Sequence, residues 1–312
     1  MESQKRQGTD HTAAKKIAEG LQLGAYVLKA DFDDDDEFFK EIAMKELRET
    51  PEVVEQALKD IKEMLKGEPD LLLPDGDEIY QKFLRPCKWY PKSAFELMKR
   101  FYKYKQNNPR YCDKLLPSTE KKVLSSGIVI PLPERNASGC RIVVVNCGKQ
   151  WNTKLISVDE IYRAVMLSLF AAIAEPKSQI GGVHVILNMA GLTLGHVTQF
   201  TPTFAAKVTE WVQKCLPCRI KGIHIVNQPF IFNMVFALFK PFLVEKMRNR
   251  IHFHGTNRES LIAYTGAKAT PVEFGGNMEL PDEPLGPKIA EYFCHFEKDF
   301  EESNKWGYNS TK

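Results

Sequence analysis

Five short runs rich in valine and isoleucine alternate with helical patterns in the second part of the chain, and this alternation restricts the fold more than any other feature. Apolar residues at helical spacing occur at about 157–175, 201–216 and 230–247. Alternating strands and helices are typical of an α/β fold with a mostly parallel sheet. The runs expected as strands are GIVIPLP (127–133), RIVVVNCG (141–148), VHVILNMAG (183–191), GIHIVNQP (222–229) and RIHFHG (250–255).

Before these runs the chain has a helical pattern. Thr50-Pro51 is a typical helix start, with threonine as the N-cap and proline in the first turn, and Gly67 ends the run. Further helices are expected from about Asp77 and over about 92–105. The last one mixes aromatic and basic side chains, which suits either nucleic-acid binding or a helix that buries its aromatic rings and exposes its lysines. We favour packing and expect no nucleic-acid partner.

These sequence patterns divide the chain into three expected regions. Residues 1–112 form an N-terminal helical region, with a bundle at about 50–112, and residues 113–280 form the α/β domain. Residues 281–312 form a tail that is rich in proline, then helical and acidic. A hydrophobic content of 43% and a charged content of 27% are ordinary for a globular protein, so the chain can build a sizeable core.

The net charge of +3 hides two segments of opposite sign. Residues 31–78 contain 18 acidic and 6 basic side chains, whereas residues 201–260 contain 9 basic and 3 acidic ones. Such asymmetry favours orientation of the basic side towards an anionic partner. The acidic run taken alone equally fits a solvated face.

Several classes of protein lack support in the sequence. The N-terminus has no apolar signal-peptide core, and no apolar run approaches the roughly 18 residues of a membrane span, so a cytoplasmic protein is expected. Seven cysteines at irregular spacing indicate free thiols. Phosphate-loop, dinucleotide-binding, nucleophile-elbow and HExxH motifs are missing, which argues against an enzyme. The Cys215/Cys218 pair has no matching second pair, and His224, His252 and His254 are interpreted as packing residues, so neither a metal nor a cofactor is expected.

The segment 230–247 is unusually apolar. At helical spacing its stripe is broader than the roughly 100° of an ordinary surface helix, which fits either a core helix or a lid. Lys240-Pro241 lies in the middle of the segment, where proline removes a hydrogen bond and is expected to bend the helix. Lys246, Arg248 and Arg250 follow it, with Arg219 and Lys221 expected at the nearby sheet edge. Apolar bulk bordered by basic groups is typical of a surface that dips into an anionic membrane, at about 1 kcal/mol for each basic residue.

The same residues resemble a known family. The stretch RIKGIHIVNQPFIFNMVFALFKPFLVEKMRNRIHFHG (219–255) and TPVEFGG (270–276) resemble the core of CRAL-TRIO lipid-transfer proteins. The likeness is greatest to the branch that contains the α-tocopherol and retinaldehyde carriers and the clavesins. FLRPCKWYPKSAFELMKRFYKY (83–104) and GLTLGHVTQFTP (191–202) are similar to further family segments, so the resemblance spans about residues 75–280.

The resemblance implies an N-terminal helical bundle followed by a CRAL-TRIO lipid-binding domain. In that domain a mixed, mostly parallel sheet flanked by helices lies around an apolar cavity, and a gate helix opens at membranes. It also implies phosphoinositide binding by Arg219, Lys221, Lys246 and Arg250. The pocket lining that it implies comprises Tyr162, Val165, Leu169, Val183, Leu187, Phe200, Val208, Trp211, Val212, Leu216, Ile220, Ile223, Phe232 and Val235.

The function implied is that of a cytoplasmic carrier that exchanges a tocopherol-, retinoid-, carotenoid- or sterol-like lipid at phosphoinositide-containing endosomal or plasma membranes. Three departures from the family pattern bear on this expectation. The family's FLRARKF is FLRPCKW here, so Cys87 replaces a basic residue, and Asn188 stands where an acidic residue is common. Val165 and Leu169 replace the pocket serines of the tocopherol branch, which favours a more apolar ligand. The alternative is a phosphoinositide-binding trafficking adaptor of clavesin type, in which ligand carriage is secondary.

Overall fold

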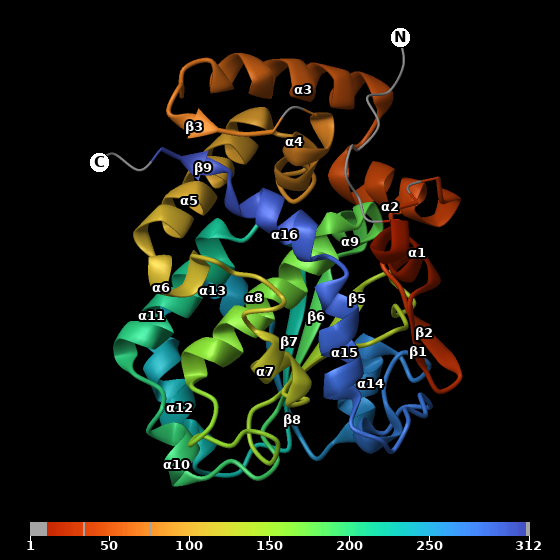
Figure 1. Ribbon diagram of the computed structural model, residues 1–312, viewed down its shortest axis with the longest axis vertical. Coiled ribbons are helices and arrows are strands. Elements are labelled where there is room, and N and C mark those ends of the chain that lie inside the picture. Colours follow the sequence, from red (N-terminus) through yellow and green to blue (C-terminus); the bar gives the residue numbers. More distant parts are fainter. Residues whose placement is uncertain (1–10, 34, 75, 310–312) are drawn as a thin grey trace.

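A five-stranded sheet forms the centre of the molecule. The computed structural model describes residues 11–33, 35–74 and 76–309 (Figure 1). The strand order is β4-β5-β6-β7-β8, with β4 antiparallel to β5 and the other neighbours parallel. These strands confirm the expected α/β class and the mostly parallel sheet. Their bounds are β4 (Val129–Pro131), β5 (Arg141–Asn146), β6 (Val183–Asn188), β7 (Ile220–Val226) and β8 (Ile251–Gly255).

The register of the strands defines two faces of the sheet. Val143, Val185 and Ile223 are paired across β5, β6 and β7, so their side chains point to one side, which we call the front face. Ile142 and His184 are paired one residue earlier and point to the other side, the back face. The strand β4 is antiparallel because the connection to β5 is too short for a parallel crossover, which needs a dozen or more residues.

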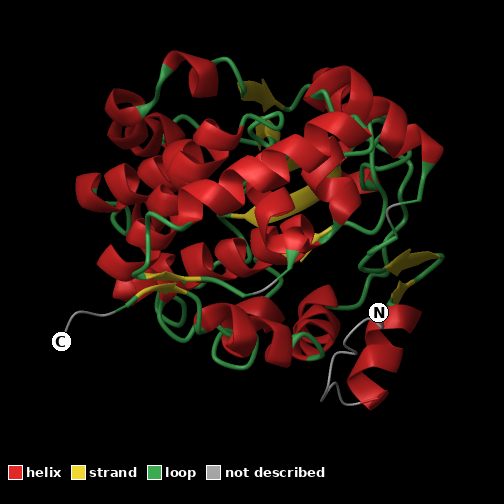
Figure 2. Cartoon of the chain, turned by 90° about the horizontal axis from the view of Figure 1, so that it is seen from above, coloured by secondary structure: helices red, strands yellow, loops and turns green. Residues whose placement is uncertain are grey.

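Helices cover both faces of the sheet (Figure 2). The strands β5 to β8 follow one another in space and in sequence, and right-handed crossovers in one direction place all the connecting helices on the same face. That face is the front, because the Phe236 ring of the last crossover lies 5.0 Å from the Phe253 ring of β8. The front helices are α8 (Val158–Ala174), α9 (Pro176–Gly181), α10 (Leu194–Val197), α11 (Pro202–Glu210), the π-helical turn η1 (Trp211–Cys215), α12 (Phe232–Phe239), the 3₁₀ turn η2 (Lys240–Phe242) and α13 (Glu245–Arg248).

The back face is covered mainly by segments that follow the sheet in sequence, together with one short helix that precedes it. The Tyr264 ring lies 4.3 Å from the His252 ring of β8, and Leu261 and Phe274 are buried in the main core. The helix that begins at Leu285 packs on β4 and on the short helix at residues 121–125 that precedes β4. The elements concerned are α7 (Lys121–Ser125), α14 (Arg258–Thr265), the 3₁₀ turn η3 (Val272–Phe274) and α15 (Leu285–Cys294).

Local signals in the sequence explain where the front helices start. The Ser157 hydroxyl accepts a hydrogen bond from the Glu160 amide, and the Glu160 carboxylate accepts one from the Ser157 amide, which is a capping box. Thr201 caps α11 through the amide of Phe204. Such caps satisfy backbone donors that have no partner in the first turn.

A second core lies in the N-terminal region, where helices pack above the sheet (Figure 1). The expected helix start at Thr50 is confirmed, since its hydroxyl accepts a hydrogen bond from Val53. Tyr102 and Tyr104 of the aromatic and basic helix are buried, which supports packing rather than nucleic-acid contact. Two short strands near the start were not expected. The elements are α1 (His11–Glu19), β1 (Leu21–Leu23), β2 (Tyr26–Leu28), α2 (Glu37–Leu47), α3 (Pro51–Leu65), β3 (Leu71–Leu72), α4 (Asp77–Leu84), α5 (Pro91–Asn107) and α6 (Pro109–Cys112).

The residues expected as a tail pack back onto this N-terminal region. The helix α16 (Glu297–Asn304) leads to β9 (Gly307–Tyr308), which pairs antiparallel with β3. The Lys105 ammonium group donates hydrogen bonds to the carbonyls of Ser303, Asn304 and Trp306 at 2.8–3.2 Å. Lys105 thus caps the C-terminal end of α16, where backbone carbonyls lack helical partners.

The segment 230–247 is not one helix, which corrects the sequence-based expectation. The α-helix α12 ends at Phe239, and η2 follows at Lys240–Phe242. The chain is extended at Leu243 and Val244 before α13 begins. Pro241 explains the break, because it has no amide hydrogen for the helical hydrogen bond and its ring clashes with the preceding turn. In the part of the chain that the structure describes, no helix is both long and apolar enough to span a bilayer.

Candidate functional site

The structure brings most of the predicted pocket residues into one core. Twelve of the 14 belong to, or pack against, the main core, which extends over both faces of the sheet. They are Tyr162, Val165, Leu169, Val183, Leu187, Phe200, Val208, Trp211, Val212, Leu216, Ile220 and Ile223.

The other two predicted pocket residues lie in an adjoining cluster. Phe232 and Val235 of α12 are buried there against Ile225 of β7 and the segment around α10. Leu187 and Phe200 pack against both clusters, so they join the main core to the underside of α12. The 14 residues therefore form one continuous apolar layer between the sheet and the front helices.

Within this layer some side chains are deeply buried and others keep accessible surface. Tyr162 and Trp211 are fully enclosed and pack edge to face, with ring centroids 5.5 Å apart. Burial raises the pKa of Tyr162, and its hydroxyl lies 3.1 Å from that of Tyr104. In contrast, Leu187 and Ile223 stay partly accessible although they lie on inner strands of the sheet. The layer is therefore tight beside α8 and looser towards α11 and α12.

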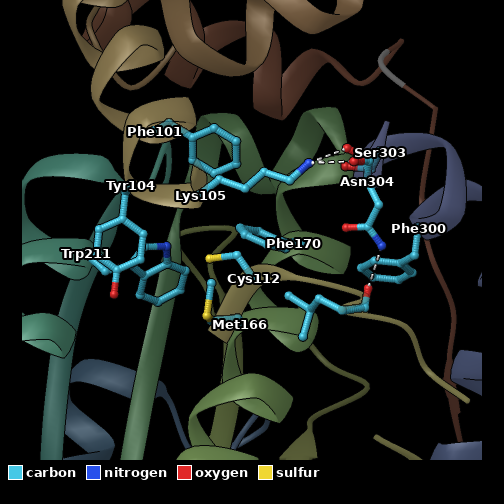
Figure 3. Close-up of a pocket in the computed structure, with 11 residues that line it drawn as sticks. Phe101, Tyr104, Lys105, Cys112, Met166, Phe170, Trp211, Phe300, Ser303 and Asn304 are labelled. Carbon is cyan, nitrogen blue, oxygen red and sulfur yellow. Dashed lines mark hydrogen bonds between the residues drawn. The ribbon is translucent and has the colours of Figure 1, made fainter. Parts of the chain in front are cut away.

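A small cavity lies between α5, α8, η1 and α16, next to the N-terminal region (Figure 3). Its volume of about 30 Å³ corresponds to roughly one water molecule, so it cannot hold a lipid. Of the 14 predicted residues only Trp211 lines it. The lining comprises Phe101, Tyr104, Lys105, Cys112, Leu115, Met166, Phe170, Trp211, Phe300, Ser303 and Asn304.

The helix α12 is apolar towards the core and towards water. Phe232 and Val235 face the interior, whereas Met234 is 55% exposed and Phe230, just before the helix, is 90% exposed. Beyond the break, Phe242 and Val244 are also exposed. Because apolar surface in water is unfavourable, such a patch usually marks a surface that contacts a membrane, a ligand or another protein.

Two of the four predicted phosphoinositide residues share one carboxylate. The Lys221 ammonium group lies 2.8 Å from the Glu46 carboxylate of α2, and the Arg219 guanidinium donates to the same oxygen. Partial burial acts to raise the pKa of Glu46, but hydrogen bonds from Lys221 and Arg219 outweigh it and hold the pKa below its usual value. Neither cation was expected to have an acidic partner.

Of the other two predicted basic residues, Arg250 lies near Arg219, and Lys246 lies near Cys87. Arg250 donates to the Ile220 carbonyl at 2.6 Å, and its pKa is lowered by burial and by the charge of Arg219. Lys246 is exposed, close enough to Cys87 for its charge to act on that thiol. Burial raises the pKa of Cys87 to about 11, against the opposing charges of Arg100 and Lys246.

Sequence reasoning missed two members of this charged site. Arg100 lies on α5 in the helix interpreted as a packing element, and Glu46 lies in the acidic run interpreted as a solvated face. Only the aromatic and basic alternation could have pointed to Arg100, and no local pattern marks Glu46. Arg85, which matches a basic position of the family, is unavailable, because it forms a buried ion pair with Glu49 and a hydrogen bond to Gln179.

The histidines form a chain on the back face. His184 Nδ1 lies 2.8 Å from His224 Nε2, His224 Nδ1 lies 3.0 Å from His254 Nε2, and His254 Nδ1 lies 2.7 Å from the Ser260 hydroxyl. Since Ser260 donates its hydroxyl hydrogen to the Asn257 carbonyl, all three imidazoles donate from Nδ1, and those of His224 and His254 also accept at Nε2. Among the described residues, no three His, Cys, Asp or Glu side chains are grouped as a metal site would require.

Comparisons with known proteins agree on one family. The model of the CRAL/TRIO domain matches residues 125–276. Human alpha-tocopherol transfer protein-like is 32% identical over 235 residues, which cover 75% of this chain and 68% of that protein. Mouse clavesin-2 is 31% identical over 273 residues, which cover 86% of this chain and 82% of that protein. A solved structure titled "Crystal structure of Sfh5" aligns with a TM-score of 0.45 and 16% identity, over 86% of this chain and 99% of that one.

Proposed function

Because this chain belongs to the CRAL-TRIO family of lipid-binding and lipid-transfer proteins, we propose that it carries one small hydrophobic lipid and exchanges it at phosphoinositide-containing membranes. The observation that carries the proposal is α12, which covers an apolar layer on one side and exposes apolar side chains on the other. The reaction is transfer without covalent chemistry, so no catalytic residue is assigned.

The first step of the proposal is opening of α12. The cavity of about 30 Å³ is too small for a lipid, and the open groove of about 360 Å³ at Lys105, Asp113 and Glu301 lies outside the apolar layer. In the proposal a ligand therefore enters the layer when part of it moves. The break at Lys240–Phe242 gives α12 a hinge at one end, because η2 and the extended residues after it lack α-helical hydrogen bonding. Membrane contact favours the open state, since the bilayer accepts apolar surface that water does not.

The second step is binding of the lipid in the space vacated by α12. The proposed wall is the set of 14 apolar residues described above, of which Leu187 and Ile223 already have accessible surface. Ser168 shares one side of α8 with Val165, and its buried hydroxyl has no hydrogen-bond partner in the described part of the chain. One polar group on an otherwise apolar lipid would satisfy it, as in a tocopherol-, retinoid-, carotenoid- or sterol-like molecule.

The third step is recognition of the membrane by the basic site. Arg219, Lys221, Lys246 and Arg250 are the proposed contacts to a phosphoinositide headgroup, and Arg100 adds a fifth cation nearby. Each contributes on the order of 1 kcal/mol near an anionic surface, which gives useful but reversible binding. We propose a cytoplasmic protein that associates peripherally with endosomal or plasma membranes.

Native mass spectrometry of the full chain purified from its own tissue tests carriage of a ligand. The expected result is one extra mass per chain that is lost on denaturation and identifies the lipid. A ligand-free mass that stays unchanged after incubation with mixed lipid extract would contradict the carrier proposal.

Vesicle binding tests the membrane step. Lys246→Ala combined with Arg250→Ala is expected to weaken binding to phosphoinositide vesicles about tenfold or more while the ligand content stays unchanged, since two headgroup contacts are lost. The matched control is Lys240→Ala with Arg248→Ala, which removes the same charge from exposed positions outside the four proposed headgroup contacts. It is expected to weaken binding to phosphoinositide and phosphatidylserine vesicles equally, because it removes only general attraction to anionic lipid. Equal binding by the first double variant and the wild type would refute headgroup recognition by these residues.

The clavesin relatives and the small cavity favour one alternative, an adaptor that recognises phosphoinositides and for which a ligand is incidental. Val165→Trp fills the proposed pocket beside α8. A carrier loses its cellular function with this substitution, whereas an adaptor keeps it.

A further inference from the structure

Basic side chains gather where the parallel strands begin. Arg141 is the first residue of β5, while Arg219 and Arg250 immediately precede β7 and β8, and Lys221 is the second residue of β7. In a parallel sheet the amino ends of the strands share one edge. This edge therefore concentrates positive charge that the fold has to neutralise.

The fold neutralises this charge in two different ways. Glu175 is almost completely buried and is bound by Arg135 at 2.6 Å and Arg141 at 2.7 Å. This arrangement is closed to solvent and to ligands. Arg219 and Lys221 share Glu46 instead, whose side chain is 45% exposed. Lys221 is 29% exposed and Arg219 only 13%, so this second site is reached from solvent on the side of Lys221 and Glu46.

The Glu46 carboxylate can move away from Arg219 and Lys221 without disturbing α2, the helix that carries it. The helix α2 is held by the buried residues Phe39, Ala43 and Leu47, all on its inner side. Glu46 itself lies in the last turn, where the helix dipole is unfavourable for a negative charge. Its carboxylate is thus kept in place by the two cations rather than by its own helix, and a rotation of one side chain releases it.

We propose that Glu46 is a built-in competitor that occupies the cation pair Arg219 and Lys221 until the phosphate of a membrane headgroup displaces it. The inference rests on the proposed membrane function and adds its regulation. A phosphate monoester carries up to two negative charges and three acceptor oxygens, so it binds the pair more strongly than one exposed carboxylate. The acidic residue therefore excludes weak anions and admits multiply charged headgroups.

The test compares the full chain with Glu46→Gln, which keeps the shape of the side chain and removes its charge. Binding is measured to phosphatidylcholine vesicles with a few mole per cent of phosphoinositide, and to vesicles in which phosphatidylserine supplies the same total charge. Glu46→Gln is expected to bind phosphoinositide vesicles about three- to tenfold more tightly than the wild type, and to discriminate less against phosphatidylserine.

Glu41→Gln is the matched control. Glu41 lies on the same helix, is exposed and pairs with Lys45 four residues later, so the substitution changes the net charge equally without touching the cation pair. A double variant supplies the second control. In a chain with Arg219→Gln and Lys221→Gln, the gain from Glu46→Gln should disappear, which a general loosening of α2 would not produce.

The outcomes separate this inference from the proposed function. If the wild type binds phosphoinositide vesicles and Glu46→Gln binds them equally, or if Glu41→Gln gains as much, the competitor role is overturned while membrane recognition stands. If no variant prefers phosphoinositide vesicles, membrane recognition falls and the competitor role falls with it. If Glu46→Gln binds free inositol phosphate or inorganic phosphate more tightly than the wild type does, but binds vesicles no more tightly, the assignment to a lipid headgroup is overturned.

Discussion

Two glutamates at the same edge of the sheet show how burial decides the role of a charged residue. Glu175 and Glu46 each bind two cations, yet only Glu175 is enclosed. Burial acts to raise the pKa of Glu175, but the charge and hydrogen bonds of Arg141 and Arg135 dominate and hold that pKa below its usual value. Glu175 therefore stays ionised inside the protein and fixes two arginines, whereas Glu46 is exchangeable.

The difference predicts opposite sensitivities to the same substitution. Glu175→Gln is expected to lower the free energy of unfolding by about 3–5 kcal/mol, because it leaves two buried guanidinium groups without their counter-charge. Glu46→Gln is expected to change it by less than about 1 kcal/mol, since exposed pairs are screened by solvent. Urea unfolding at neutral pH measures both values. Similar losses for the two variants would contradict the division into a structural and an exchangeable carboxylate.

At this scale the sequence predicts apolar positions better than charged ones. Val183, Trp211 and Ile220 were expected as pocket lining from the resemblance to the family, and the structure buries all three. The partners of Arg219 and Arg85 were not predicted, since Glu46 and Glu49 lie far away in sequence and meet them only through tertiary packing. Whether the 14 apolar residues line a ligand site stays a prediction.

Among the elements, β7 and β8 carry opposite chemistry on their two faces. On the front, Ile225 and Phe253 support α12, while on the back His224 and His254 belong to the histidine chain. The neutral imidazoles of His224 and His254 each donate one hydrogen bond and accept one, so a proton added to either ring removes an acceptor from the histidine chain. Burial lowers the pKa of His184 to about 4 and that of His224 to about 3.

The histidine chain predicts that the protein loses stability in mild acid. The folded pKa values lie below the unfolded value of about 6.5, so the unfolded state binds more protons as the pH falls. The stability present above about pH 6.5 should decline towards pH 4, by on the order of 3 kcal/mol for the whole chain of histidines. Urea unfolding between pH 7 and pH 4 checks this expectation. His224→Gln is expected to reduce the dependence of the free energy of unfolding on pH. His295→Gln, at a histidine that is not part of the histidine chain, is expected to leave this dependence unchanged. A wild-type slope that His224→Gln leaves intact would assign the pH dependence to other groups.

The elements themselves were largely readable from the sequence. All five expected strands exist, and the helix starts at Thr50 and Thr201 were marked by the cap and the proline that follows. The direction of β4 was not readable, because it depends on the length of its connection rather than on residue type. The interruption of α12 was underestimated, since Pro241 ends the helix instead of bending it.

For the whole molecule, the N-terminal helices and the end of the described chain form one packing unit. Trp306 and Tyr308 pack against the second core, the Tyr308 hydroxyl bonds to Glu68, and Lys105 caps α16. No pattern in the sequence indicates this return, because β3 and β9 are two residues each and carry no strand pattern.

Trp306→Ala combined with Tyr308→Ala is therefore expected to destabilise the N-terminal helical region, although both residues lie near the other end of the described chain. Loss of two partly buried aromatic side chains should cost about 2–4 kcal/mol. The rate of amide hydrogen exchange should increase in α3 and α5, and not only near the two substitutions. Lys305→Gln, at an exposed position between the same elements, is the control. Unchanged exchange in α3 and α5 would show that the return contributes nothing to the helical core.

The pairing of β3 with β9 also bears on how the chain acquires its structure during translation. Glu68 and Tyr308 are separated by 240 positions, so the first-made helices emerge from the ribosome long before their closing strand exists. Bringing such distant segments together carries a loop-closure cost that only the completed sheet domain can reduce, by holding the ends near each other. The region synthesised first is thus the region finished last, and its apolar surface stays available to chaperones throughout synthesis of the sheet domain.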